Sequence, residues 1–271
     1  MLQIPDLERR FGGLARLYGK AGAARIRQAH VVVVGIGGVG SWAAEALARS
    51  GVASLTLIDL DHIAESNINR QIHALDTTLG QSKVQAMKER IALINPDCDV
   101  RCVEEFVDSA NWPAVANLDL QAESTLAILD ACDQVKAKTA MAAWAMQHKL
   151  NFITVGAAGG KRYAHQVDVD DLARTTHDPL LAQLRYRLRK EHNAARQGKL
   201  GVTCVFSRES IVRPANTADA ATELEQTDNS LNCHGYGSVV SVTATFGICA
   251  AGWLLDGFAQ QCQLEPQKIT L

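Results

Sequence analysis

The chain has 271 residues, 47% of them hydrophobic, and a formal net charge of −2 at pH 7. This length predicts one large domain, or a core with an elaborated second half, and the charge excludes a global attraction to nucleic acid. None of the seven cysteines forms a C-x-x-C pair, which argues against a zinc site built from such pairs. An odd cysteine count without a signal peptide predicts reduced thiols in the cytoplasm.

Residues 1–29 are amphipathic and basic, which predicts a solvated helix packed against the core. The glycines in the stretch 11–19 are unusual for such a helix. They favour a turn that presents Arg16.

The next residues have the pattern of a phosphate-binding turn. Val31 to Val34 predict a buried strand, Gly35, Gly37 and Gly40 have the G-x-G-x-x-G spacing, and 41–49 predict a helix. A strand that turns sharply into a helix directs unpaired backbone N–H groups at one point, which suits a phosphate. The motif alone indicates a nucleotide or dinucleotide, with NAD or FAD as the usual ligand.

A second expected strand, residues 54–58, ends at Asp59, which lies 19 residues beyond Gly40. An acidic residue there is placed to accept hydrogen bonds from ribose hydroxyls, and a simple strand-ending turn is the alternative. The chain then adds Arg70 and Lys83 close to this strand end. Arg70 offers a planar guanidinium that can donate paired hydrogen bonds to phosphate oxygens, and Lys83 offers a compact ammonium charge. Because a triphosphate carries more negative charge than the pyrophosphate of NAD, two such cations together favour a triphosphate.

Further strands are expected at 99–104, 124–129 and 151–155, and helices at 83 to about 93 and at 135 to about 148. Alternating strands and helices predict an α/β fold, with a Rossmann-like, doubly wound and mainly parallel sheet. The C-terminal half is more elaborate: 163–169 alternates like an antiparallel strand, and Asp178 opens another helix.

Residues 238–255 form a run of eighteen positions without a charge. A membrane span needs about 20 predominantly apolar residues. Four positions here are Ser or Thr, and no basic cluster flanks the run. We therefore expect a buried helix and no stable membrane insertion.

Four motifs, in this order, resemble the ubiquitin-activating-enzyme superfamily, which includes the adenylyltransferases of molybdopterin and thiamine biosynthesis. They are G-I-G-G-V-G-S (35–41), I-D-x-D (58–61), S-N-x-N-R-Q (66–71) and G-x-x-K (80–83). The resemblance implies that ATP converts a carboxylate to an acyl adenylate, with release of pyrophosphate. It implies a set of nucleotide-binding residues: Gly35, Gly37, Gly38, Gly40, Asp59, Asp61, Asn67, Asn69, Arg70, Gln71 and Lys83.

In the superfamily pattern, an Asp followed by Asn at a later strand end holds magnesium and the triphosphate. Asp133 matches this position, although Gln134 replaces the Asn, and Asp130 is the near alternative. A helix N-cap is the structural alternative for such an Asp. The superfamily's N-terminal arginine reaches the neighbouring subunit's site, which matches Arg16 and implies a homodimer. The implied catalytic residues are Arg16, Arg70, Lys83 and Asp133, and the implied cofactors are ATP and Mg²⁺ held through ATP.

A narrower resemblance, to the bacterial tRNA threonylcarbamoyladenosine dehydratases, extends from residue 10 to about 255. It rests on the stretches 10–19, 69–75, 198–207 and 242–247. It implies an enzyme that binds a tRNA carrying threonylcarbamoyladenosine beside the anticodon and activates its threonyl carboxylate, after which the carbamoyl group closes a ring. One alternative enzyme adenylates the C-terminus of a small, ubiquitin-like sulfur-carrier protein. A nucleotide-gated scaffold and an NAD oxidoreductase are further hypotheses.

The resemblance implies one adenylating domain, 1–271, with a nucleotide-binding core at about 29–157 and a tRNA-facing, dimer-contributing region at about 158–271. The implied partners are tRNA carrying threonylcarbamoyladenosine and a second copy of the chain. A cysteine desulfurase or sulfur-acceptor system is an additional option.

Three features of the second half leave alternatives open. Six basic residues between 185 and 199 are either a solvated helix face or a contact for RNA phosphates. Cys204 is expected to be a buried, inert thiol rather than the thioester-forming cysteine of some relatives. Residues 217–228 are acidic and predict a mobile loop without structure of its own.

Overall fold

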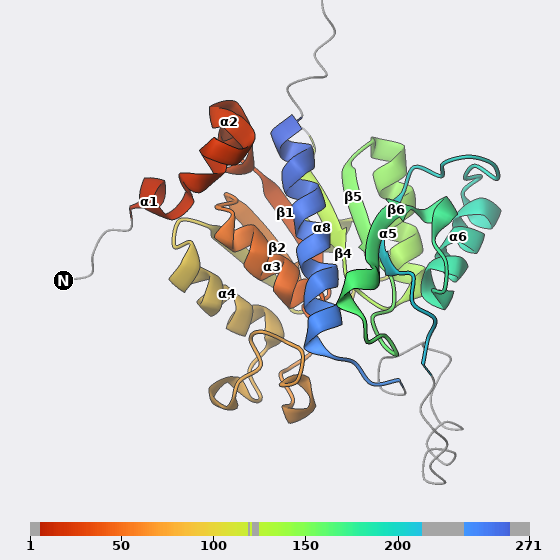
Figure 1. Cartoon of the computed structure of the whole chain (residues 1–271), viewed down its shortest axis with the longest axis horizontal. Coiled ribbons are helices and arrows are strands. Elements are labelled where there is room, and N and C mark those ends of the chain that lie inside the picture. Colours follow the sequence, from red (N-terminus) through yellow and green to blue (C-terminus); the bar gives the residue numbers. More distant parts are fainter. Residues whose placement is uncertain (1–5, 119, 121–124, 213–235, 261–271) are drawn as a thin grey trace, which may run out of the picture.

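The computed structural model describes residues 6–118, 120, 125–212 and 236–260 (Figure 1). The acidic stretch 217–228 lies outside these residues. The helices are α1 (Leu7–Phe11), α2 (Gly13–Ile26), α3 (Gly40–Arg49), α4 (Lys83–Ile94), α5 (Val135–His148), α6 (Pro179–Glu191) and α8 (Val240–Gln260). The strands are β1 (His30–Val34), β2 (Ser54–Ile58), β3 (Asp99–Val103), β4 (Leu126–Asp130), β5 (Asn151–Val155), β6 (Val167–Asp171) and β7 (Thr203–Ser207).

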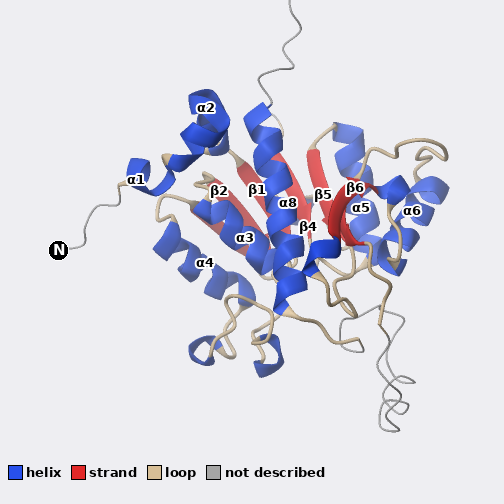
Figure 2. Cartoon of the chain, viewed as in Figure 1, coloured by secondary structure: helices blue, strands red, loops and turns tan. Residues whose placement is uncertain are grey.

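A seven-stranded sheet in the order β3-β2-β1-β4-β5-β7-β6 forms the centre of the molecule, and helices pack against it (Figure 2). All neighbouring strands are parallel except β6, which runs antiparallel to β7. The predicted doubly wound, mainly parallel α/β sheet is therefore confirmed. The strand order reverses between β1 and β4, which is where such sheets bind ligands.

The register of β1 brings three chain segments together at the carboxyl edge of the sheet. Val34 lies opposite Ile58 on one side and opposite Asp130 on the other. The residues that follow these strand ends, including Gly35 and Asp59, therefore leave the sheet side by side. This edge is the lower one in Figure 1, where the loops between β2 and α4 also lie.

The apolar helix α8 crosses the sheet and packs against α3 and α2 (Figure 1). It is long and apolar enough to span a membrane by length and composition, but half of its apolar window is buried inside the fold. Its inner face belongs to the main hydrophobic core through residues that include Val242, Phe246, Ala250, Leu254 and Phe258. The expected helix forms, and it is buried along one face.

The stretch 11–19 is interrupted at its glycines, with a turn at Gly12 between α1 and α2 and a kink at Gly19, where φ is 75°. Arg16 is exposed to solvent, as expected, but lies on the helical segment between these two positions. One local expectation was wrong. The antiparallel strand predicted at 163–169 begins only at Val167, because residues 164–166 form a 3-10 turn.

Gly247 marks the closest approach of α8 to the start of α3. A methyl group at this position would lie 2.4 Å from the carbonyl oxygen of Val39 and 2.8 Å from the amide nitrogen of Ala43. We expect Gly247→Ala to lower the free energy of unfolding by about 1–3 kcal/mol, because backbone atoms cannot yield as a flexible side chain would. Urea unfolding followed by circular dichroism measures the change.

Gly252 provides the control on the same helix, since a methyl group there would meet nothing within 4 Å. Gly252→Ala should raise the free energy of unfolding by up to about 1 kcal/mol through helix propensity. Equal effects of the two substitutions would contradict the proposed close packing of α8 on α3.

Candidate functional site

The glycine turn between β1 and α3 is compact because its glycines touch backbone. A Cβ on Gly40 would lie 1.8 Å from the carbonyl oxygen of Gly35, and one on Gly35 would lie 2.8 Å from the carbonyl oxygen of Ala131. Gly35 also has a φ of +87°, which other residues rarely adopt. No side chain caps the start of α3. Its first N–H groups therefore suit an anionic ligand.

The carboxylate of Asp59 lies against this turn. Its Oδ2 accepts a hydrogen bond from the Ile36 amide at 2.6 Å, and its Oδ1 accepts one from the Asp61 amide at 2.9 Å. Burial raises the pKa of Asp59 above its ordinary value, although Lys83 and these two donors act to lower it. Each oxygen keeps a further lone pair, so the carboxylate can still accept from ribose hydroxyls.

Lys83 reaches this carboxylate from the first turn of α4. Its Nζ lies 2.6 Å from Oδ2 of Asp61 and 3.9 Å from Oδ1 of Asp59. The lysine side chain is 8% exposed and that of Asp61 54% exposed. The ammonium group is therefore held at the inner wall of the site, with its nearest counter-ion open to solvent.

Arg70 packs against the glycine turn at Gly38. Its Nη1 donates to the carbonyl oxygen of Ser66 at 2.8 Å and to Oδ1 of Asn69 at 2.9 Å. Its aliphatic part packs over Gly38, where a Cβ would lie 3.2 Å from the Arg70 Cγ. The absence of a side chain at Gly38 thus allows the arginine to lie along the turn.

These groups line one cleft at the switch point of the sheet, with a volume of about 230 Å³. Of the predicted site residues, nine line this cleft: Gly35, Gly37, Gly38, Asp59, Asp61, Arg70, Gln71, Lys83 and Asp133. The other four, Gly40, Asn67, Asn69 and Arg16, do not line it. Asn67 instead accepts a hydrogen bond from the Ala64 amide, and Asn69 donates to the carbonyl oxygen of Ser238.

The two aspartates after β4 have different surroundings. Asp133 is exposed and lines the cleft. Asp130 is fully buried and engaged by Lys138 and Thr154, so it cannot face a metal in the cleft. Among the described residues, no group of three or more His, Cys, Asp and Glu side chains could hold a metal ion by itself. A magnesium ion here would therefore need phosphate oxygens besides Asp133, which is a common arrangement for this ion.

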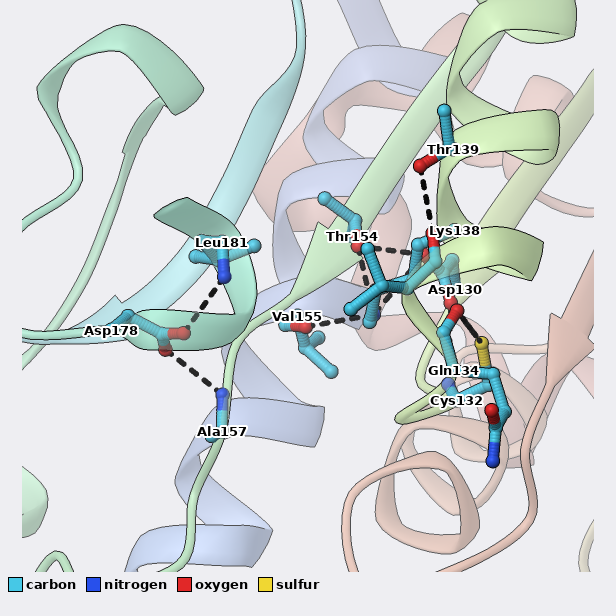
Figure 3. A network of polar contacts seen from close by, with 11 residues as sticks. Asp130, Cys132, Gln134, Lys138, Thr139, Thr154, Val155, Ala157, Asp178 and Leu181 are labelled. Carbon is cyan, nitrogen blue, oxygen red and sulfur yellow. Dashed lines mark hydrogen bonds and ion pairs between the residues drawn. The ribbon is translucent and has the colours of Figure 1, made fainter. Parts of the chain in front are cut away.

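A buried polar network holds the loop 131–134 in place (Figure 3). The Lys138 ammonium lies 3.1 Å from Oδ2 of Asp130 and donates to Thr154 Oγ1 and to the Val155 carbonyl oxygen. The other oxygen of Asp130 accepts from the amide and the thiol of Cys132. Burial opposes the charge on Lys138, but Asp130 raises the pKa of that lysine above its ordinary value. The loop that presents Asp133 is thus anchored to β4 and β5.

Several residues of the site were missed by reasoning from sequence. Phe106 lines the cleft with 62% of its surface exposed, between Glu105 and Val107, and Thr243 reaches it from α8. An aromatic residue shortly after the expected strand 99–104 was the only local signal for Phe106. Thr243 lies in the family-like stretch 242–247, but nothing there indicates a position in the cleft, and Lys138 carried no signal because its partners lie in distant parts of the sequence.

Three of the six basic residues in 185–199 contact other groups of the fold, while Lys190, Arg196 and Lys199 are exposed. Arg185 donates to the carbonyl oxygens of Leu172 and Thr175, and Arg187 pairs with Glu191. Its helix, α6, starts beside the carboxyl end of β5, where Asp178 accepts from the Ala157 amide (Figure 3), and runs away from the cleft. The stretch is therefore not part of the cleft.

Cys204 is fully buried in β7 and does not line the cleft. Burial raises the pKa of its thiol well above the ordinary value, so the thiolate form is disfavoured. The predicted buried thiol is confirmed.

This arrangement has the features of a nucleotide-binding site on a doubly wound α/β protein: an uncapped helix start, a largely buried carboxylate and two cations in one cleft. Residues 10–265 match the ThiF family. The chain belongs to this family, as the motifs indicated.

Individual relatives are similar over nearly the whole chain. The tRNA threonylcarbamoyladenosine dehydratase of Haemophilus influenzae is 41% identical over 259 residues, which cover 94% of this chain and 95% of that protein. The protein of the same name from Escherichia coli is 43% identical over 251 residues, covering 91% and 92%. A crystal structure of the E. coli protein in complex with ATP has a TM-score of 0.83 at 40% identity and covers 97% of this chain and 100% of that one.

Removal of Lys138 should be costly, because Asp130 would be left buried without its partner. We expect Lys138→Ala to lower the free energy of unfolding by about 3–5 kcal/mol. Lys136→Ala, at an exposed position of the same helix, is the control and should change it by less than about 0.5 kcal/mol. Urea unfolding compares the two variants, and similar midpoints would show that the buried pair does not stabilise the fold.

Proposed function

We propose that the protein is an ATP-dependent tRNA threonylcarbamoyladenosine dehydratase. The observation that carries this proposal is the cleft in which Asp59, Arg70 and Lys83 meet the glycine turn. Two relatives that are 41% and 43% identical bear this name, and the E. coli structure contains ATP. The protein acts in the cytoplasm, where its tRNA substrate is found.

In the proposed orientation of ATP, each part of the nucleotide meets a different group of the cleft. Asp59 accepts from the ribose hydroxyls, and the start of α3 faces the phosphates. Arg70 and Lys83, which both line the cleft, neutralise negative charge on the triphosphate. Asp133 would hold Mg²⁺ together with phosphate oxygens, and the ion would supply additional charge neutralisation.

The reaction needs no nucleophile from the protein. An oxygen of the threonyl carboxylate attacks the α-phosphorus of ATP, and pyrophosphate leaves. The carbamoyl group of the same nucleoside then attacks the activated carbonyl carbon, a proton is lost and AMP departs. Because the attacking group is already tethered, proximity lowers the second barrier, while Arg70 and Lys83 stabilise charge that develops on the transferred phosphorus.

The alternative, adenylation of a sulfur-carrier protein, is less well supported. The sequence has no C-x-x-C pair, and both relatives named above are tRNA-modifying enzymes. An NAD oxidoreductase is disfavoured because two cations line the cleft in addition to the glycine turn. A cysteine desulfurase or sulfur-acceptor system is retained only as an accessory partner.

Arg16 acts in a homodimer, from the neighbouring subunit. It is exposed on α2 and does not line the cleft of its own chain. Its guanidinium would add a third cation to the triphosphate of the partner's site.

Pyrophosphate release should depend on tRNA that carries threonylcarbamoyladenosine. We expect Arg70→Ala and Lys83→Ala each to slow it by about 100-fold or more, because preorganised cations stabilise the developing charge. Lys88→Ala, on the exposed side of α4, is the control and should retain full activity. Circular dichroism verifies folding, and equal pyrophosphate release with unmodified tRNA would exclude the proposed substrate.

Mixed dimers test the placement of Arg16. Arg16→Ala and Arg70→Ala proteins should each be inactive alone, but after subunit exchange half of the dimers are mixed and each contains one complete site. Activity should return to about a quarter of the wild-type value. No recovery would mean that Arg16 acts within its own subunit, and full activity of Arg16→Ala alone would mean that Arg16 takes no part in the reaction.

A further inference from the structure

The loop after β5 carries an exposed aromatic and basic cluster that the adenylation chemistry does not use. Ala158 in this loop lines the nucleotide cleft, and five residues later Tyr163 is 45% exposed. Five residues of chain span at most about 18 Å. The loop lies at the same lower edge of the sheet as the cleft (Figure 1). Tyr163 is therefore close enough to contact a substrate that extends out of the cleft.

The backbone of this loop is fixed from the inside. Oε2 of the buried Glu209 accepts hydrogen bonds from the amides of Arg162 at 2.8 Å and Tyr163 at 2.9 Å. Lys161 is also buried and donates to the carbonyl oxygens of His177 and Glu209. The side chains of Arg162 and Tyr163 are thus held outward by a rigid backbone, so that binding a ligand would cost little ordering of the loop.

The exposed side chains stack on one another. The Arg162 guanidinium lies 5.6 Å from the centre of the Tyr163 ring, and the His165 ring lies 5.6 Å from it on a plane tilted by 41°. Arg162 forms no ion pair with any carboxylate of the described residues. An aromatic face with cationic neighbours on a rigid loop suits an unpaired nucleobase and its phosphate.

We propose that Arg162, Tyr163 and His165 form a stacking platform for an unpaired nucleobase that adjoins the modified adenosine in the anticodon loop of tRNA. This inference rests on the proposed function, which brings a nucleoside of that loop to the cleft. The basic stretch 185–199 is the other candidate RNA surface, but several of its arginines bind groups of the fold and its helix runs away from the cleft.

The test measures binding and dehydration separately. An anticodon stem-loop RNA is titrated into the protein to obtain a Kd, and dehydration of the full-length modified tRNA gives kcat and KM. Tyr163→Ala should weaken stem-loop binding and raise the KM for tRNA by about tenfold, since it removes a base-stacking contact. Tyr163→Phe keeps the ring and should retain wild-type binding, and the Kd for ATP should be unchanged in both variants.

Tyr186 supplies a matched control, because it is an exposed tyrosine that also stacks with a cation, Lys190, at 5.6 Å, but on α6. Tyr186→Ala should bind the stem-loop as the wild type does. Equal binding by Tyr163→Ala and wild type, or equal losses in Tyr163→Ala and Tyr186→Ala, would overturn the platform.

The two proposals fail in different ways. If the wild-type protein dehydrates modified tRNA but Tyr163→Ala has an unchanged KM, the platform is refuted and the proposed function is not. If the wild-type protein binds the stem-loop through Tyr163 but never dehydrates modified tRNA, the proposed function is refuted and the platform is supported.

Discussion

The buried ion pair between Asp130 and Lys138 is the interaction on which the carboxyl edge of the sheet depends. It joins the end of the central strand β4 to α5 and β5, and the second oxygen of Asp130 fixes the loop that presents Asp133. A charge pair in this position is costly to bury, and the hydrogen bonds from Thr154 and Cys132 compensate that cost. The loop that presents Asp133 to the cleft is therefore anchored by two charged groups that do not themselves line the cleft.

Both halves of the chain contribute residues to this cleft. The first half supplies the glycine turn, Asp59, Arg70 and Lys83. The second half adds Thr243 from α8 and Ala158 from the loop after β5. Because α8 packs directly on α3, the position of the helix start at the glycine turn is coupled to a segment some two hundred residues later. In the proposed stacking platform, the loop beyond Ala158 extends the site toward the substrate.

Much of the cleft could be predicted from sequence, because its signals are local. Glycine spacing after a run of valines determines the turn, and the acidic residue at the end of the next strand follows from the same unit. The parts that could not be predicted depend on contacts between distant segments. Lys138 finds partners on two strands, and β7 inserts between β5 and β6, which no local pattern indicates. Asn67 and Asn69 match the motif, yet the structure uses their amides to hold loops together.

The central claim is that the cleft uses ATP to remove one water molecule from a modified nucleoside of tRNA. The most direct measurement is mass spectrometry of the nucleosides released from tRNA after incubation with the wild-type protein, ATP and Mg²⁺. The account predicts that threonylcarbamoyladenosine loses the mass of one water, only when ATP is present. Consumption of ATP with an unchanged nucleoside mass would contradict it.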